Sequence, residues 1–124
     1  MEKPSIVLIV EDDALLAEMA LEMIEDVGRP AVAVYSVDAG LDFLKENSGR
    51  VSAMFSDVRL KGALNGVELA AFVAVRWPDI AICVTSGVAL ERPYRLPKNA
   101  RFMPKPWKAL EVISFVEEAA RPRV

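Results

Sequence analysis

Short, almost uninterrupted apolar runs alternate along this chain with segments of helical periodicity, and this alternation constrains the fold more than any other feature. Five runs predict β-strands, at residues 6–10, 31–35, 53–56, 80–84 and 101–104. Strands that are apolar throughout, rather than at every second position, are expected in a sheet covered on both faces. Because helical segments separate the runs, the strands are expected to be parallel.

The segments between the runs carry apolar residues at spacings of three and four, which predicts amphipathic helices. Asp13 and Ser36 are expected to cap the first two helices, and Pro106 with Trp107 to open the last one. The expected apolar stripes are Leu16, Met19, Met23 and Val27 in the first helix, Leu41 and Leu44 in the second, Val67, Leu69, Ala70 and Val73 in the third, and Leu110, Ile113 and Val116 in the last, which also carries Glu117.

Residues 88–99 break this regularity, because they contain two prolines and no helical stripe. The fourth helix of the expected fold is therefore predicted to be short or disordered. The remaining elements predict an α/β fold, a flavodoxin-like doubly wound five-stranded parallel sheet with strand order 2-1-3-4-5.

Polar residues stand where these strands end. Glu11 and Asp12 follow the first run, Asp57 follows the third, Thr85 the fourth and Lys105 the fifth. Parallel sheets bind ligands at the carboxyl ends of their strands, so these side chains are expected to share one site. Several carboxylates in one crevice require a bound cation or a proton, and Mg²⁺ suits an all-oxygen ligand set.

The same residues predict phosphoryl chemistry. The carboxylate of Asp57 can attack phosphorus and form an aspartyl phosphate, while a divalent ion and the ammonium of Lys105 neutralise the phosphoryl oxygens. Each residue alone has an ordinary explanation: acids at a helix N-terminus, an aspartate in a turn, a threonine in a strand, a surface lysine. Their joint placement favours the functional interpretation.

Four motifs, in this order and near the usual spacing, resemble the receiver domain of two-component response regulators. They are residues 10–13 (Val-Glu-Asp-Asp), 55–57 (Phe-Ser-Asp), 84–87 (Val-Thr-Ser-Gly) and 102–106 (Phe-Met-Pro-Lys-Pro). The resemblance covers nearly the whole chain and implies a single receiver domain over residues 1–124, with its core at about 5–120.

The resemblance also assigns roles to the site residues. It implies that Asp57 accepts a phosphoryl group from a histidine kinase or histidine phosphotransfer protein, and that Thr85 and Lys105 contact this group. It implies that Mg²⁺ binds Glu11, Asp12, Asp57 and the backbone carbonyl of Arg59. The bond between Lys105 and Pro106 is expected to be cis.

A conformational switch is implied as well. Thr85 would move toward the phosphoryl group, and Phe102 would turn inward behind it. The signal would pass to an unknown downstream protein through the face formed by residues 88–99, the fifth strand and the last helix. Phe102 has no hydroxyl group, so it cannot report the state through a tyrosine-like hydrogen bond.

Two departures from the receiver pattern stand beside the shortened fourth helix. The loop after Asp57 lacks the common proline and runs about one residue longer. No output domain follows Pro122, which is expected of a stand-alone regulator or of a receiver cut from a larger protein.

Charge and hydropathy exclude several function classes. Acidic side chains outnumber basic ones 12 to 4 in residues 1–57, which argues against nucleic-acid binding. There is no apolar run of membrane-spanning length and no signal peptide, so no membrane partner and a cytoplasmic location are expected. The lone Cys83 lies in an apolar run and is expected to be a buried structural thiol.

Two other functions stay open. The chain contains no histidine, so it is expected to receive rather than donate the phosphoryl group. An Mg²⁺-dependent phosphohydrolase of small molecules could also use an aspartyl nucleophile, although this chain has no second acid two residues after Asp57 and no cap domain. A receiver-like scaffold that works without phosphorylation is the other alternative.

Overall fold

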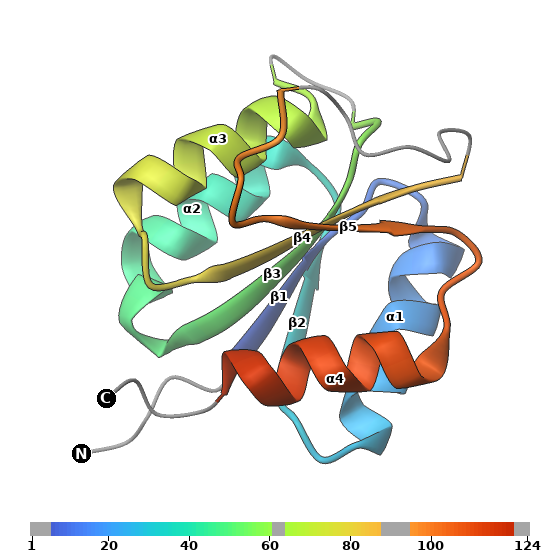
Figure 1. Ribbon diagram of the computed structural model, residues 1–124. Coiled ribbons are helices and arrows are strands. Elements are labelled where there is room, and N and C mark those ends of the chain that lie inside the picture. Colours follow the sequence, from blue (N-terminus) through green and yellow to red (C-terminus); the bar gives the residue numbers. More distant parts are fainter. Residues whose placement is uncertain (1–5, 61–63, 88–94, 121–124) are drawn as a thin grey trace.

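The computed structural model describes residues 6–60, 64–87 and 95–120, and its centre is a parallel sheet of five strands. The strands are β1 (Ile6–Val10), β2 (Ala31–Val34), β3 (Val51–Asp57), β4 (Ala81–Ser86) and β5 (Arg101–Pro104). Their order is β2-β1-β3-β4-β5, and every neighbouring pair is parallel (Figure 1). The predicted fold class and strand order are confirmed.

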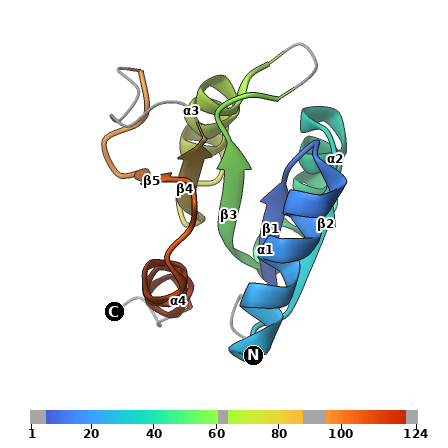
Figure 2. The ribbon, with the colours of Figure 1, turned by 90° about the vertical axis from the view of Figure 1, so that its right-hand side faces the viewer.

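Helices cover both faces of the sheet (Figures 1 and 2). Helices α1 (Ala14–Asp26) and α4 (Ala109–Ala119) lie on one face, and α2 (Val37–Asn47) and α3 (Gly66–Arg76) lie on the other. A short 3-10 turn, η1 (Ser48–Arg50), leads into β3. Successive residues of β1, β3 and β4 enter opposite cores, which explains why these strands are apolar at almost every position.

Local sequence explains where the first helices begin and end. The carboxylate of Asp13 accepts hydrogen bonds from the N–H groups of Leu15 and Leu16, and the hydroxyl of Ser36 accepts one from Ala39. After α1, Gly28 adopts a φ of 83°, a left-handed conformation that glycine takes without steric cost. Both predicted N-caps are confirmed.

Two predicted apolar stripes are shifted from the buried faces of their helices. In α1 the buried positions are Ala17, Ala20 and Ile24, whereas the predicted Met19 is 49% exposed. In α4 the buried positions are Val112, Phe115 and Val116, and the predicted Leu110 is 82% exposed. The last helix also begins later than predicted, at Ala109, so Pro106 and Trp107 belong to the loop that precedes it.

The segment between β4 and β5 is only partly described. Within residues 95–100 the chain forms turns rather than a helix, and Leu96 and Ala100 are buried in the core beneath α2 and α3. Residues 88–94, which carry the rest of the predicted short helix, lie outside the described residues. The described part of the chain contains four α-helices.

Cys83 lies at the centre of β4 with none of its surface exposed. Burial disfavours the thiolate and raises the pKa of this thiol to about 12. The thiol is therefore a packing group, as the sequence predicts, and not a nucleophile.

Candidate functional site

Four strands and the loops that follow them bring the predicted site residues to one edge of the sheet. Glu11 follows β1 directly, Asp57 is the last residue of β3, and Lys105 follows β5. Thr85, in β4, lies opposite Asp57 in the register of the two strands. The strand order places β1 beside β3, so Glu11 and Asp57 meet at the topological switch point of the sheet. At this point the chain, which has moved from β1 to one side, crosses to the other side.

Lys105 joins the two carboxylates. Its Nζ lies 2.7 Å from Oδ2 of Asp57 and 3.1 Å from Oε1 of Glu11. The side chains are 16% exposed for Lys105, 14% for Asp57 and 5% for Glu11, so this ion-pair cluster is largely shielded from water. Residues 94 positions apart in the sequence are thus held in direct contact.

Burial and these contacts shift two pKa values. Burial alone would lower the pKa of Lys105, but its hydrogen bonds to Asp57 and Glu11 outweigh burial and raise that pKa above its ordinary value. Burial raises the pKa of Glu11, and the hydrogen bonds from the Asp13 amide and from Lys105 offset this only in part. The ammonium therefore stays charged throughout the neutral range.

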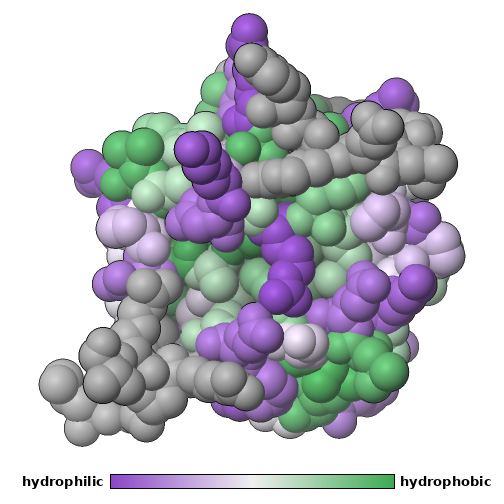
Figure 3. All heavy atoms as spheres, viewed as in Figure 1, coloured by the Kyte–Doolittle hydropathy of each residue, from purple (hydrophilic) through white to green (hydrophobic). Residues whose placement is uncertain are grey.

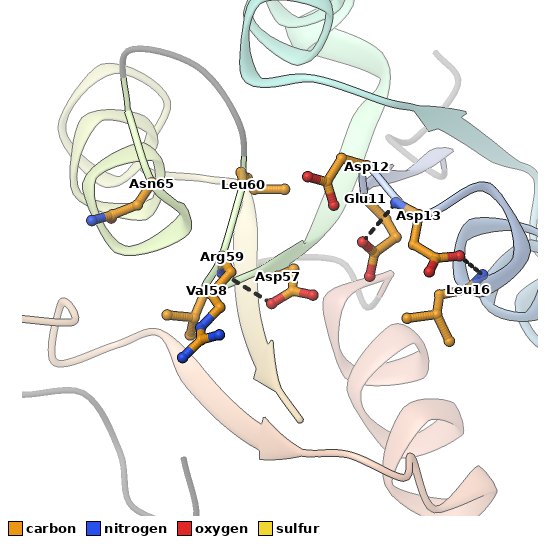
Figure 4. A pocket seen from close by; sticks show the side chains of 9 residues that line it. All are labelled: Glu11, Asp12, Asp13, Leu16, Asp57, Val58, Arg59, Leu60 and Asn65. Carbon is orange, nitrogen blue, oxygen red and sulfur yellow. Dashed lines mark hydrogen bonds between the residues drawn. The ribbon is translucent and has the colours of Figure 1, made fainter. Parts of the chain in front are cut away.

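Backbone amides hold the remaining carboxylate oxygens. The N–H of Arg59 donates to Oδ1 of Asp57 at 3.0 Å, and the N–H of Asp13 donates to Oε2 of Glu11 at 3.1 Å (Figure 4). Both carboxylates are therefore oriented by the chain that follows them. Asp13 serves as the cap of α1, as predicted, and its carboxylate is engaged with that helix.

An open cleft of about 620 Å³ lies over these carboxylates. Glu11 and Asp12 line one side and the chain after Asp57 lines the other, so three acids from two neighbouring strand ends face one space (Figure 4). The full lining consists of Glu11, Asp12, Asp13, Leu16, Asp57, Val58, Arg59, Leu60 and Asn65. Asp57 lines this opening, so its carboxylate can be reached from solvent.

The chemical types of these residues suit a magnesium ion. The carboxylates of Glu11, Asp12 and Asp57 and the carbonyl of Arg59 would give an all-oxygen ligand set, which Mg²⁺ prefers. Within the described residues, no group of three or more acidic side chains is gathered closely enough to hold a metal. Lys105 instead contacts two of these carboxylates, and ligation of Mg²⁺ by these four residues stays a prediction.

The two predicted switch residues lie in β4 and β5. Thr85 is 2% exposed, and its carbonyl accepts a hydrogen bond from the N–H of Val58 at 2.8 Å. Phe102 is half-buried and packs against the core beneath α2 and α3. The peptide bond between Lys105 and Pro106 is cis, as predicted.

Sequence reasoning missed two residues that shape the site. Gly66, the first residue of α3, packs against the backbone of Asp57, and an Asn-Gly pair after a strand was the available signal. Trp107 places its ring beside the ammonium of Lys105. Its position after Pro106 predicts only the start of a helix.

No family model matches the chain. Solved structures do match it over nearly its full length. A response regulator receiver protein from Sinorhizobium medicae WSM419 has a TM-score of 0.83 at 22% identity, with 94% of each chain covered. A response regulator receiver domain protein from Clostridium thermocellum has a TM-score of 0.81 at 16% identity, also with 94% of each covered.

The receiver domain of NtrX from Brucella abortus matches as well, with a TM-score of 0.78 at 22% identity, covering 92% of this chain and 97% of that domain. The chain therefore has the fold of response regulator receiver domains. None of the helices in the described part of the chain has both the length and the hydropathy that a membrane-spanning helix requires.

Proposed function

We propose that this protein is a phosphorylation-dependent receiver that accepts a phosphoryl group on Asp57 from a histidine kinase or histidine phosphotransfer protein. The observation that carries the proposal is the contact of the Lys105 ammonium with both Asp57 and Glu11 at the mouth of an acidic cleft. The receiver fold supports the same function. Residues 1–124 as a single receiver domain, and a cytoplasmic location, stay predictions.

The proposed reaction transfers a phosphoryl group from a histidine nitrogen of the partner to a carboxylate oxygen of Asp57. A carboxylate oxygen of Asp57 attacks the phosphorus of a phosphohistidine, the P–N bond breaks, and the partner's imidazole leaves with the electron pair of that bond. An acyl phosphate forms on Asp57. Hydrolysis later returns the carboxylate and releases inorganic phosphate.

The residues of the cluster stabilise charge during this transfer. The Lys105 ammonium already lies at hydrogen-bonding distance from Asp57, so it can contact a phosphoryl oxygen without a long movement. Mg²⁺ bound by Glu11, Asp12, Asp57 and the Arg59 carbonyl would supply further positive charge to the phosphoryl oxygens. The hydroxyl of Thr85, opposite Asp57, would donate a hydrogen bond to an oxygen of the phosphoryl group on the product.

The partner is proposed to dock beside the cleft on α1. Leu15 is 67% exposed and Met19 49% exposed, although both are large apolar side chains. Leu110 of the neighbouring α4 is 82% exposed, and hydrophobic surface lies over this helix at the lower right of Figure 3. Apolar surface next to a reactive carboxylate favours a protein phosphodonor over a free metabolite.

The proposal is tested by measuring intact mass after incubation with acetyl phosphate and Mg²⁺. We expect one phosphoryl adduct on the native chain, none without Mg²⁺, and none on Asp57→Asn. Asp42→Asn, an exposed acid on α2, is the matched control and should be modified like the native chain. An adduct that persists on Asp57→Asn would contradict the assignment.

Two further outcomes distinguish the alternatives. Full signalling by Asp57→Asn would favour a scaffold that works without phosphorylation. Rapid multiple turnover of small phosphate esters would favour a phosphohydrolase.

A further inference from the structure

The ammonium of Lys105 has three N–H groups, and the carboxylates account for two of them. One donates to Asp57 at 2.7 Å and one to Glu11 at 3.1 Å. The nitrogen also lies over the ring of Trp107, 5.6 Å from its centroid. This distance is within reach of a cation–π interaction, so the indole is the third partner of the ammonium.

The indole N–H of Trp107 does not explain why a tryptophan stands at this position. It is buried and has no hydrogen-bond partner within the described residues. An unsatisfied buried donor is costly, and a phenyl ring of similar shape would avoid it. Trp is favoured here for its ring face, which attracts cations more strongly than those of Phe and Tyr.

Both the ring and the lysine stem are held in place. Trp107 packs against the core formed with α1 and α4, which fixes the ring from behind. The backbone N–H of Lys105 donates to the carbonyl of Ser86 at 2.7 Å. The lysine stem passes Gly87, where an added Cβ would lie 3.6 Å from Cδ of Lys105, an ordinary contact. The ammonium is therefore placed between a fixed ring and the two carboxylates.

We infer that Trp107 is a positioning residue that holds the Lys105 ammonium over Asp57 for phosphoryl transfer. This inference rests on the proposed function. The carboxylate of Asp57 loses its charge and gains a phosphoryl group in the reaction, whereas the ring face does not change. Trp107 thus gives Lys105 a partner that is constant through the reaction cycle.

The first test compares rates of Asp57 phosphorylation by acetyl phosphate, followed by intact mass. Trp107→Leu keeps an apolar side chain without a π face, and we expect it to slow the reaction about fivefold. Trp107→Phe retains a ring and should stay within about twofold of the native rate. Trp107→Met serves if the leucine variant does not unfold cooperatively.

Trp77 offers a matched control elsewhere in the molecule. It follows α3, has its own cationic neighbour in Arg76 at 5.8 Å, and makes an edge contact with Phe72. Trp77→Leu should lower stability and leave the phosphorylation rate unchanged. A rate at position 107 that follows stability alone, with Phe and Leu equally slow, would overturn the positioning role.

A second test does not depend on phosphorylation. In a double-mutant cycle of Trp107→Leu and Lys105→Met, the unfolding equilibrium constant of the double variant should depart about fivefold from the product of the single effects. Absence of coupling overturns the inference. If the native chain forms no adduct, the proposed function fails, and the positioning role fails with it. Coupling measured in that case would still identify the contact between Trp107 and Lys105 as a structural one.

Discussion

At the scale of single residues, the site depends on Gly66, which has no side chain, as much as on the charged residues. A Cβ added to Gly66 would overlap the carbonyl oxygen of Asp57 and lie 2.7 Å from its carbonyl carbon. The amide of Gly66 also donates to the carbonyl of Val58 at 2.8 Å. The backbone that carries the proposed phosphoacceptor therefore packs directly on the first turn of α3.

We expect Gly66→Ala to destabilise the protein by about 2 kcal/mol, because backbone atoms must shift to admit the methyl group. Phosphorylation of Asp57 should slow as well. Gly49→Ala is the control, since a Cβ there meets nothing within 4 Å, and its effect should stay within about 0.5 kcal/mol. Urea unfolding measures both, and a Gly66→Ala variant as stable as the native chain would refute the close contact.

The identities of the strand-end residues could be predicted at this scale, but their contacts could not. Glu11, Asp57 and Lys105 follow apolar runs, and parallel topology brings such positions together. The sequence contains no signal for which carboxylates Lys105 contacts, because this depends on side-chain rotamers and on the path of the loop before α4. The roles of Gly66 and Trp107 depend on approaches of a few ångströms and were missed for the same reason.

At the scale of elements, the helices begin in unequal ways. Helix α3 starts with a capping box, in which Asn65 and Glu68 each accept a hydrogen bond from the other's backbone amide at 2.9 Å. The N-cap of helix α4 is Lys108, which has extended backbone geometry and no side-chain hydrogen bond to the helix. Its third helical position is already Glu111, so half of a capping box is present.

Lys108→Ser is therefore expected to stabilise the protein by about 1 kcal/mol, since the serine hydroxyl can accept from an unsatisfied amide of the first turn. Lys108→Ala removes the lysine without adding a cap and separates capping from loss of charge. Thermal or urea unfolding provides the comparison. Equal stability of the serine and alanine variants would refute this account of the α4 N-terminus.

The elements themselves were predictable, but the buried faces of two helices were not. In α2 the apolar stripe is bordered by polar residues, and Leu44 is buried as predicted. In α3, which is apolar at most positions, Leu69 and Val73 are also buried as predicted. Apolar residues surround α1 and α4 on more than one side, so periodicity alone admits several faces. In α1 the small Ala17 and Ala20 approach the sheet closely, and the larger Leu15 and Met19 lie outside.

At the scale of the whole molecule, two ion pairs connect α4 to other parts of the chain. Arg29, before β2, forms two hydrogen bonds with Glu117, at 2.8 Å and 3.2 Å. Arg101 of β5 pairs with Glu118 at 3.0 Å. Phe115 of the same helix packs edge-on against Phe55 in the core. The last helix is thereby held both to the segment before β2 and to the edge strand β5.

A double-mutant cycle of Arg29→Ala and Glu117→Ala should give a coupling energy of about 0.5–1 kcal/mol, the upper range for a partly exposed pair with two hydrogen bonds. The pair of Arg101 and Glu118 makes one contact and is more exposed, so its cycle should give a smaller value. Chemical denaturation at low salt measures both. A larger coupling for the second pair would contradict the geometric argument.

The parallel topology also separates the two ends of the sheet. Strand β1 starts, and helix α4 ends, at the edge away from the cleft, whereas Asp57 and Lys105 lie at the other edge (Figure 1). A fluorescent label or a sensor surface attached at Ile6 or at Ala119 is therefore joined on the side remote from Asp57. Immobilised molecules should remain open to phosphodonors in solution, so the domain suits label-free recording of its own modification.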